Sequence, residues 1–238
     1  MESGSSLPIL NEPKVDVMTY QQLISSLMYA MVCTRPDISY AVGIVACHIA
    51  TPSEVHLKAV KQIFHYLQET SDYKLTYRAE EGPDEPVVYS DSDWAGDRID
   101  HKSITGYVTH LAGGAITWAS CKQACVSTSS TEAKFIAATT GCQEALWLCN
   151  FFDSIHLSIT IPISLCSDNQ FTINLITTGN VNECTKHIDT KYRFICDHNE
   201  SGDIVTSYIP TDQQPADGFT KALPPVKFVP FISALGLM

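Results

Sequence analysis

Apolar side chains recur at three- and four-residue steps between residues 18 and 70, a spacing typical of amphipathic helices. The pattern predicts three helices, at about 18–31, 36–50 and 51–67. Pro36 suits the first turn of the second helix, where its missing amide hydrogen costs nothing. No catalytic group stands out here, so we expect residues 18–78 to form a small helical module that serves packing. Residues 1–17 show no periodicity and are expected to be flexible.

The pattern changes after residues 79–86, an acidic stretch broken by Gly and Pro that predicts a linker. Beyond it, β-branched and aromatic runs alternate with helical stretches. The expected strands are 87–92, 105–111, 115–120, 163–166 and 204–209, with 73–77 as a further candidate; the expected helices are 130–152, 169–178, 187–199 and one from about 214. This order predicts an α/β domain over residues 87–238, built on a five-stranded mixed sheet with flanking helices.

Composition narrows the class of protein. The chain has 238 residues, of which 45% are hydrophobic and 17% charged, so a globular core is expected. The net charge of −11 argues mildly against nucleic acid as a partner, although a local basic patch or bound divalent cations can reverse the field. Nine cysteines without paired short spacings fit a reducing compartment. No secretory signal or membrane span is predicted, so we expect a cytoplasmic protein, with a virus-like particle or the nucleus as alternatives.

Three aspartates, Asp91, Asp93 and Asp97, lie at or just beyond the end of the first expected strand of the α/β domain. An acidic strand end is either a turn or half of a metal site, because carboxylate oxygens are preferred ligands of hard divalent cations. Asp91 and Asp93 project to the same face of an extended strand, so either could be the inward group. Asp97 is expected to be a solvated turn residue.

Completing a metal site would require acids from elsewhere, and the candidates are Glu132, Asp168 and Asp217. Each of them also has a structural interpretation. Glu132 fits a capping box with Ser129 at the start of a helix. Asp168 could cap the helix that follows it, and Asp217 would suit the dipole in the first turn of the last helix. The residues alone leave both interpretations open.

Short segments around these acids and in the helical module carry a resemblance. They are Tyr20–Leu27, Thr34–Val42, Tyr89–Asp97, Ser103–Tyr107, Gly113–Trp118, Ser129–Ala133, Cys166–Gln170, Thr185–Asp189, Ala216–Asp217 and Thr220–Pro224. In this order they resemble the ribonuclease H fold, and more closely the carboxy-terminal part of the Pol polyprotein of copia-type long-terminal-repeat retrotransposons. Residues 18–78 would then correspond to the connection between polymerase and nuclease.

The resemblance implies a ribonuclease H that cuts RNA within RNA–DNA hybrids during reverse transcription. Two Mg²⁺ ions about 4 Å apart would support the reaction, with Mn²⁺ able to substitute. By the family pattern Asp91 would bridge both ions, Glu132 and Asp168 would complete one side, and Asp217 would hold the other. Substrate contacts are implied for five residues: Ser129, Ser130, Asn169, Lys186 and His187.

Several residues remain open to a second interpretation. The hydroxyl-rich run 127–131 suits a phosphate at a helix N-terminus, but helix capping alone would select the same residues. His187 could equally be packed or solvated. Lys134 takes a place usually filled by an acid in relatives, and we expect its side chain to point away from the metal face.

Two hypotheses of different class follow. The first is the Mg²⁺-dependent hybrid endonuclease. The chain contains no Asp-Asp dipeptide, so the polymerase site of reverse transcriptases is absent, and a polymerase domain is an expected partner beside the RNA–DNA hybrid. The second is a non-catalytic remnant or interaction module that associates with a reverse transcriptase through residues 18–70.

Overall fold

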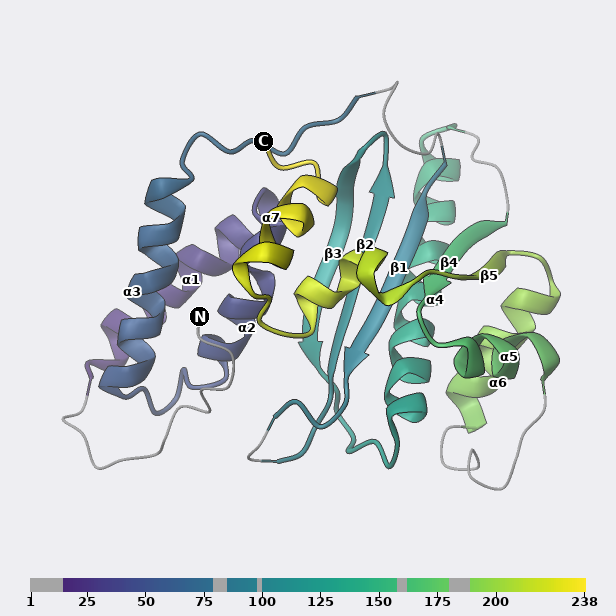
Figure 1. Cartoon of the computed structure of the whole chain (residues 1–238), viewed down its shortest axis with the longest axis horizontal. Coiled ribbons are helices and arrows are strands. Elements are labelled where there is room, and N and C mark those ends of the chain that lie inside the picture. Colours follow the sequence, from purple (N-terminus) through teal and green to yellow (C-terminus); the bar gives the residue numbers. More distant parts are fainter. Residues whose placement is uncertain (1–14, 79–84, 98–99, 158–161, 180–188) are drawn as a thin grey trace.

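The computed structural model describes residues 15–78, 85–97, 100–157, 162–179 and 189–238 (Figure 1). Most of the expected linker at 79–86 therefore lies outside the described residues, as does most of the expected flexible start. Within the described ranges, no helix is both long enough and apolar enough to cross a membrane.

The centre of the molecule is a five-stranded mixed sheet, as predicted. Its strands are β1 (Val87–Asp93), β2 (Ile104–Leu111), β3 (Gly114–Lys122), β4 (Ile163–Ser167) and β5 (Ile204–Tyr208). They lie in the order β3-β2-β1-β4-β5. The first three strands pair antiparallel, whereas β1, β4 and β5 run parallel. The carboxyl ends of three neighbouring strands therefore meet at one edge, where ligands collect in α/β sheets.

Helix α4 (Ser130–Ser154) packs closely on the centre of this sheet. A Cβ at Gly141 would lie 2.9 Å from Cδ1 of Leu165 and 3.2 Å from Cγ1 of Val88, so a bare glycine allows this approach. Helices α5 (Gln170–Thr178) and α6 (Asp189–Glu200) extend the same core beyond α4, beside β4 and β5 (Figure 1). The predicted flanking helices are thus present.

The C-terminal segment crosses the sheet in front of β1 and β2, whereas α4 lies behind it (Figure 1). The prediction of one helix from about 214 is wrong. The structure has two short 3-10 turns, η3 (Thr211–Gln213) and η4 (Pro215–Phe219), and then helix α7 (Pro225–Ala234). Pro224 and Pro225 account for the break in the helix. A proline lacks the amide hydrogen that a helix needs, and it disfavours a helical conformation of the residue before it.

The three predicted N-terminal helices form a core of their own. They are α1 (Val17–Cys33), α2 (Ser39–Ala46), preceded by the 3-10 turn η1 (Pro36–Ile38), and α3 (Glu54–Glu69). Helix α2 ends at Ala46, four residues short of the predicted end. Residues 73–77 are not a strand; a single antiparallel bridge joins Leu75 to Leu237 beside α7. This bridge attaches the segment after α3 to the C-terminal segment.

A candidate active site at the carboxyl edge of the sheet

Asp91, in β1, is level with Asp168, the residue that follows the neighbouring parallel strand β4. The register of β1 and β4 pairs Val87 with Ser164 and Tyr89 with Cys166, so positions 91 and 168 come next in line. The side chains of Asp91 and Asp168 are 2% and 6% exposed. Two buried carboxylates so close together would repel each other without a cation between them.

That cation is Lys134, a residue expected to point away from this face. Its Nζ lies 2.5 Å from Oδ1 of Asp168 and 3.0 Å from Oδ1 of Asp91. The contact with Asp168 is a hydrogen bond, whereas the contact with Asp91 is an ion pair without hydrogen-bond alignment. Burial disfavours the ammonium, but the two carboxylates outweigh it and raise the pKa of Lys134 above its ordinary value. The expectation for Lys134 is therefore wrong.

The reason lies in the spacing along α4. Lys134 precedes Gly141 by seven residues, which is close to two helical turns, so both lie on one side of the helix. Gly141 is in contact with β1 and β4. Lys134 consequently extends toward the end of the same two strands, where Asp91 and Asp168 lie.

Asp217 approaches Asp91 from the opposite face of the sheet. It belongs to η4 and not, as predicted, to the first turn of the last helix. Thr220 links the two acids: its Oγ1 is 3.0 Å from Oδ2 of Asp91 and 3.1 Å from the main-chain oxygen of Asp217. Gly106, which pairs with Asp91 across β1 and β2, makes room for η4. A Cβ there would lie 2.7 Å from Cβ of Phe219.

The acids of this edge affect one another electrostatically. Burial, followed by the negative charge of Asp91, raises the pKa of Asp217 to about 6, although Lys221 acts in the opposite direction. Burial likewise raises the pKa of Asp93, at the end of β1. Asp93 is half-buried, and the charges of Lys221 and Asp91 also act on it, so it is a neighbour of the site.

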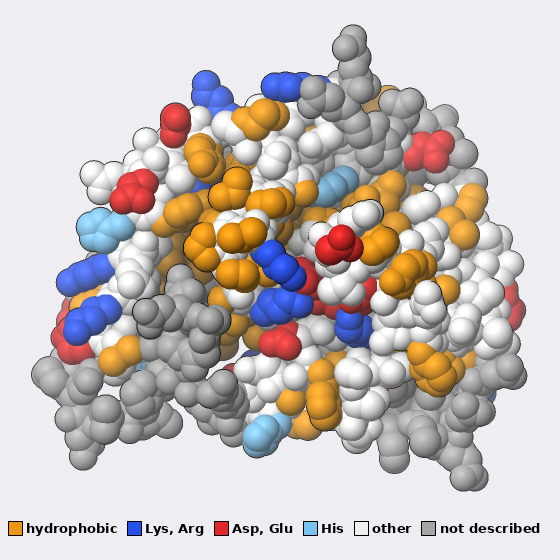
Figure 2. Space-filling model, viewed as in Figure 1, with side chains coloured by type: hydrophobic (Ala, Val, Ile, Leu, Met, Phe, Trp, Pro, Cys, Tyr) orange, Lys and Arg blue, Asp and Glu red, His pale blue; other side chains and the backbone are white. Residues whose placement is uncertain are grey.

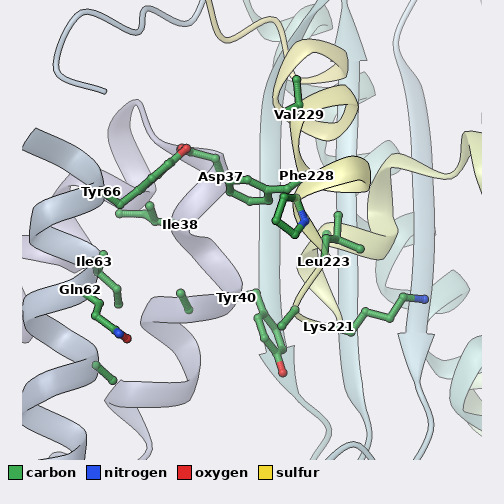
Figure 3. A pocket seen from close by; sticks show the side chains of 15 residues that line it. Asp37, Ile38, Tyr40, Gln62, Ile63, Tyr66, Lys221, Leu223, Phe228 and Val229 are labelled. Carbon is green, nitrogen blue, oxygen red and sulfur yellow. The ribbon is translucent and has the colours of Figure 1, made fainter. Parts of the chain in front are cut away.

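Lys221 is the second cation of the site. Its Nζ lies 2.8 Å from Oδ2 of Asp217, and its side chain is 42% exposed. Lys221 also borders a cavity of about 470 Å³ between the helical module and the C-terminal segment. Figure 3 shows its amine turned away from Tyr40 and across the strands. In Figure 2, acidic and basic side chains gather near the middle of this face, beside a hydrophobic patch.

Glu132 takes part in capping α4. Its Oε2 accepts hydrogen bonds of 2.6 Å from both the amide and the hydroxyl of Thr128. Ser129 is the N-cap residue, and its hydroxyl accepts the amide hydrogen of Glu132 at 3.1 Å. The capping interpretation is thus realised one residue earlier than predicted, since Glu132 bonds to Thr128 and not to the amide of Ser129. The structure does not bring Glu132 into the network around Lys134.

The predicted substrate contacts are distributed unevenly. Ser129 and Ser130 lie at the exposed N-terminus of α4. Asn169, and not Asp168, caps α5 by accepting the amide hydrogen of Thr172. The carboxylate of Asp168 therefore does not serve as the helix cap. Lys186 and His187 lie outside the described residues. Their substrate roles stay predictions.

The two halves of the site fit a divalent cation differently. On the Asp217 side, Oδ1 of Asp217 is buried without a hydrogen-bond partner, and Asp91 lies near it, so hard oxygen ligands are available. On the Asp168 side, the ammonium of Lys134 already contacts both carboxylates. Among the described residues, no group of three or more His, Cys, Asp and Glu side chains is arranged to hold a metal ion.

The chain is similar to parts of much longer polyproteins. It is 40% identical over 211 residues to the retrovirus-related Pol polyprotein from transposon TNT 1-94 of Nicotiana tabacum, a match over 88% of this chain and 16% of that protein. It is 34% identical over 223 residues to the Pol polyprotein from transposon RE1 of Arabidopsis thaliana, over 93% of this chain and 15% of that protein. The chain thus spans about a sixth of these relatives' length. No protein-family model matches it.

Two further similarities cover part of the chain. Secreted RxLR effector protein 161 of Plasmopara viticola is 41% identical over 129 residues, which make up 54% of this chain and 90% of that protein. Among solved structures, LC11-RNase H1, isolated from compost by a metagenomic approach, is 15% identical with a TM-score of 0.44. That match covers 58% of this chain and 94% of the other.

Proposed function

The chain belongs to the family of retrovirus-related Pol polyproteins of copia-type transposons, and on that premise we propose that it acts as their ribonuclease H. Its reaction would be the endonucleolytic, metal-dependent hydrolysis of RNA in RNA–DNA hybrids during reverse transcription. The helical module would connect this nuclease to a polymerase domain, which is the proposed protein partner.

The observation that carries the proposal is the convergence of three buried aspartates from separate segments. Asp91 comes from β1, Asp168 follows β4, and Asp217 comes from η4 on the opposite face. Their carboxylates surround the carboxyl edge of the sheet and are held there by Lys134, Thr220 and Lys221. Burying three carboxylates together costs free energy of folding, and such clusters are typical of functional sites that bind cations.

The aspartates would hold the cations that the reaction needs. Divalent ions such as Mg²⁺, or Mn²⁺ in its place, would supply activation of water and stabilisation of the leaving oxygen. Asp91 lies between Asp168 and Asp217, so it is the aspartate that would bind a cation on either side. The hydroxyl of Thr220 fixes the Asp91 carboxylate by holding Oδ2. Exposed Lys221 lies beside Asp217, where its charge would favour the phosphate backbone of the hybrid.

A labelled RNA–DNA hybrid tests the proposal. We expect the full chain to cut the RNA strand in the presence of Mn²⁺ or Mg²⁺, and Asp91→Asn to abolish cutting. Asp212→Asn is the matched control, because Asp212 is an exposed acid in the nearby turn η3. Cleavage that survives Asp91→Asn would contradict the assignment. If the natural chain and the Lys134→Glu variant both bind the hybrid but neither cuts it, the non-catalytic alternative is favoured.

A further inference from the structure

Lys134 differs from Glu132, its neighbour on α4, in the groups that its charged end contacts. It is the residue of this helix whose polar end reaches both Asp91 and Asp168, whereas Glu132 is bonded to Thr128. The side chain of Lys134 is 19% exposed, so its ammonium is largely withdrawn from water. Its contacts are therefore part of the interior arrangement and differ from a surface ion pair that exchanges freely with solvent.

The ammonium uses the same oxygens that a metal ion would need. Oδ1 of Asp168 and Oδ1 of Asp91 lie 2.5 Å and 3.0 Å from Nζ. A Mg²⁺ ion bound to this pair would require oxygens at about 2.1 Å in nearly octahedral geometry. Nζ and a divalent ion cannot occupy the space between these two oxygens together, and their positive charges would repel each other.

The Asp217 half of the site is different. The buried Oδ1 of Asp217 has no hydrogen-bond partner. The cation beside it, Lys221, is 42% exposed and can turn into solvent at little cost. A divalent ion near Asp91 and Asp217 therefore displaces only a partly exposed lysine.

We propose that Lys134 is a built-in counter-cation that replaces one of two divalent ions, blocking the Asp91–Asp168 half of the site and leaving the Asp91–Asp217 half open. This inference rests on the proposed function for the identity of the ligand acids. It makes the chain, as its sequence stands, a weakened nuclease whose metal affinity is limited by one side chain. Replacing Lys134 with an acid removes a positive charge and adds a ligand at the same place.

Calorimetric titration of the full chain with Mn²⁺ tests the inference without relying on activity. We expect the natural chain to bind one ion weakly. Lys134→Glu should bind a second ion and raise the apparent affinity at least about tenfold, since a full charge reversal acts at contact distance. Lys134→Gln, which removes the charge without adding a ligand, should fall between them. Lys61→Glu on the exposed side of α3 is the control for net charge and should leave the titration unchanged.

The outcomes separate this inference from the proposed function. If the natural chain binds two ions as tightly as Lys134→Glu and Lys134→Gln, the inference is wrong, whatever the cleavage assay shows. If Lys134→Glu gains a second ion but still leaves the hybrid uncut, Lys134 is the counter-cation and the proposed hydrolysis fails. Thermal unfolding with and without Mn²⁺ tests whether each variant is folded. A larger metal-dependent rise in Tm for Lys134→Glu than for the natural chain supports the inference independently.

Discussion

The hydroxyl of Thr220 lies 3.0 Å from Oδ2 of Asp91, and this contact joins the C-terminal turn η4 to the first strand of the sheet. Both side chains are buried: Thr220 is 0% and Asp91 2% exposed. Because Oδ1 of Asp91 is paired with Lys134, the carboxylate is held from two sides by groups on opposite faces of the sheet. Its orientation is therefore determined by α4 and η4 together.

Thr220→Val should weaken this attachment. Valine keeps the shape of threonine but removes the donor, which leaves a carboxylate oxygen unsatisfied, at a cost of about 1–3 kcal/mol in the free energy of unfolding. Urea unfolding measures the loss. The matched control is Thr172→Val on α5, since Thr172 is also 0% exposed but its Oγ1 has no hydrogen-bond partner. That control should be neutral or slightly stabilising, and an equal loss for both variants would contradict the role given to the Thr220–Asp91 contact.

Gly106→Ala should displace η4 from the sheet. The added Cβ would lie 2.7 Å from Cβ of Phe219 and 2.9 Å from the main-chain oxygen of Ala216, so the turn must move. We expect a loss of about 1–3 kcal/mol in stability, as for other overpacked sites. Lower hybrid cleavage should accompany it, because Asp217 belongs to the same turn.

Gly43→Ala is the comparison for that variant. Gly43 lies within α2, and the nearest atom to an added Cβ would be the main-chain oxygen of Ser120 at 3.7 Å, an ordinary contact. Alanine has a higher helix propensity than glycine, so this change should leave the free energy of unfolding unchanged or raise it slightly. Similar losses for Gly43→Ala and Gly106→Ala would show that the close approach of η4 is not the cause.

Arg35→Met should destabilise the helical module strongly. The Arg35 guanidinium pairs with Asp37 at 2.7 Å, and Asp37 also accepts the hydroxyl of Tyr66 at 2.6 Å. Both charged residues are buried, so removing one partner leaves an unpaired charge, at a cost of about 3–5 kcal/mol. Adding Asp37→Leu should recover part of the loss seen by thermal unfolding. Simple addition of the two single losses would argue against coupling of this pair.

Protonation of His110 should make the free energy of unfolding fall as the pH is lowered. Burial lowers the pKa of His110 to about 4, from an ordinary value of 6.5. Below 6.5 the unfolded chain takes up a proton that the folded chain does not, so stability is fully present above 6.5 and decreases as the pH falls toward 4. The upper limit of this effect is on the order of 3 kcal/mol.

His110→Phe tests this assignment, since phenylalanine retains a ring beside Tyr89 but does not titrate. Urea midpoints at about pH 7 and about pH 5 should differ less for the variant than for the natural chain. Part of the slope should remain, because burial and then the charge of His48 lower the pKa of His56 to about 4. Identical slopes in the two proteins would exclude His110 as a source.

Much of the fold follows from local pattern. Helical periodicity locates α1, α3 and α4 to within a few residues, and alternating β-branched runs locate the five strands of the sheet. These patterns succeed because burial of one face constrains side chains close together in sequence. They fail at residues 73–77 and after residue 214, where a single bridge and two prolines decide the structure.

The sequence by itself determined which acids lie at strand ends and which family the motifs resemble, since both depend on neighbouring residues. Only the tertiary structure decided that Lys134 faces Asp91 and Asp168 while Glu132 bonds to Thr128. Periodicity specifies the direction in which a side chain leaves its helix. It does not specify where the charged end of a long side chain finds a partner, because that partner comes from strands and turns distant in sequence. The chemistry of this site depends on those distant pairings.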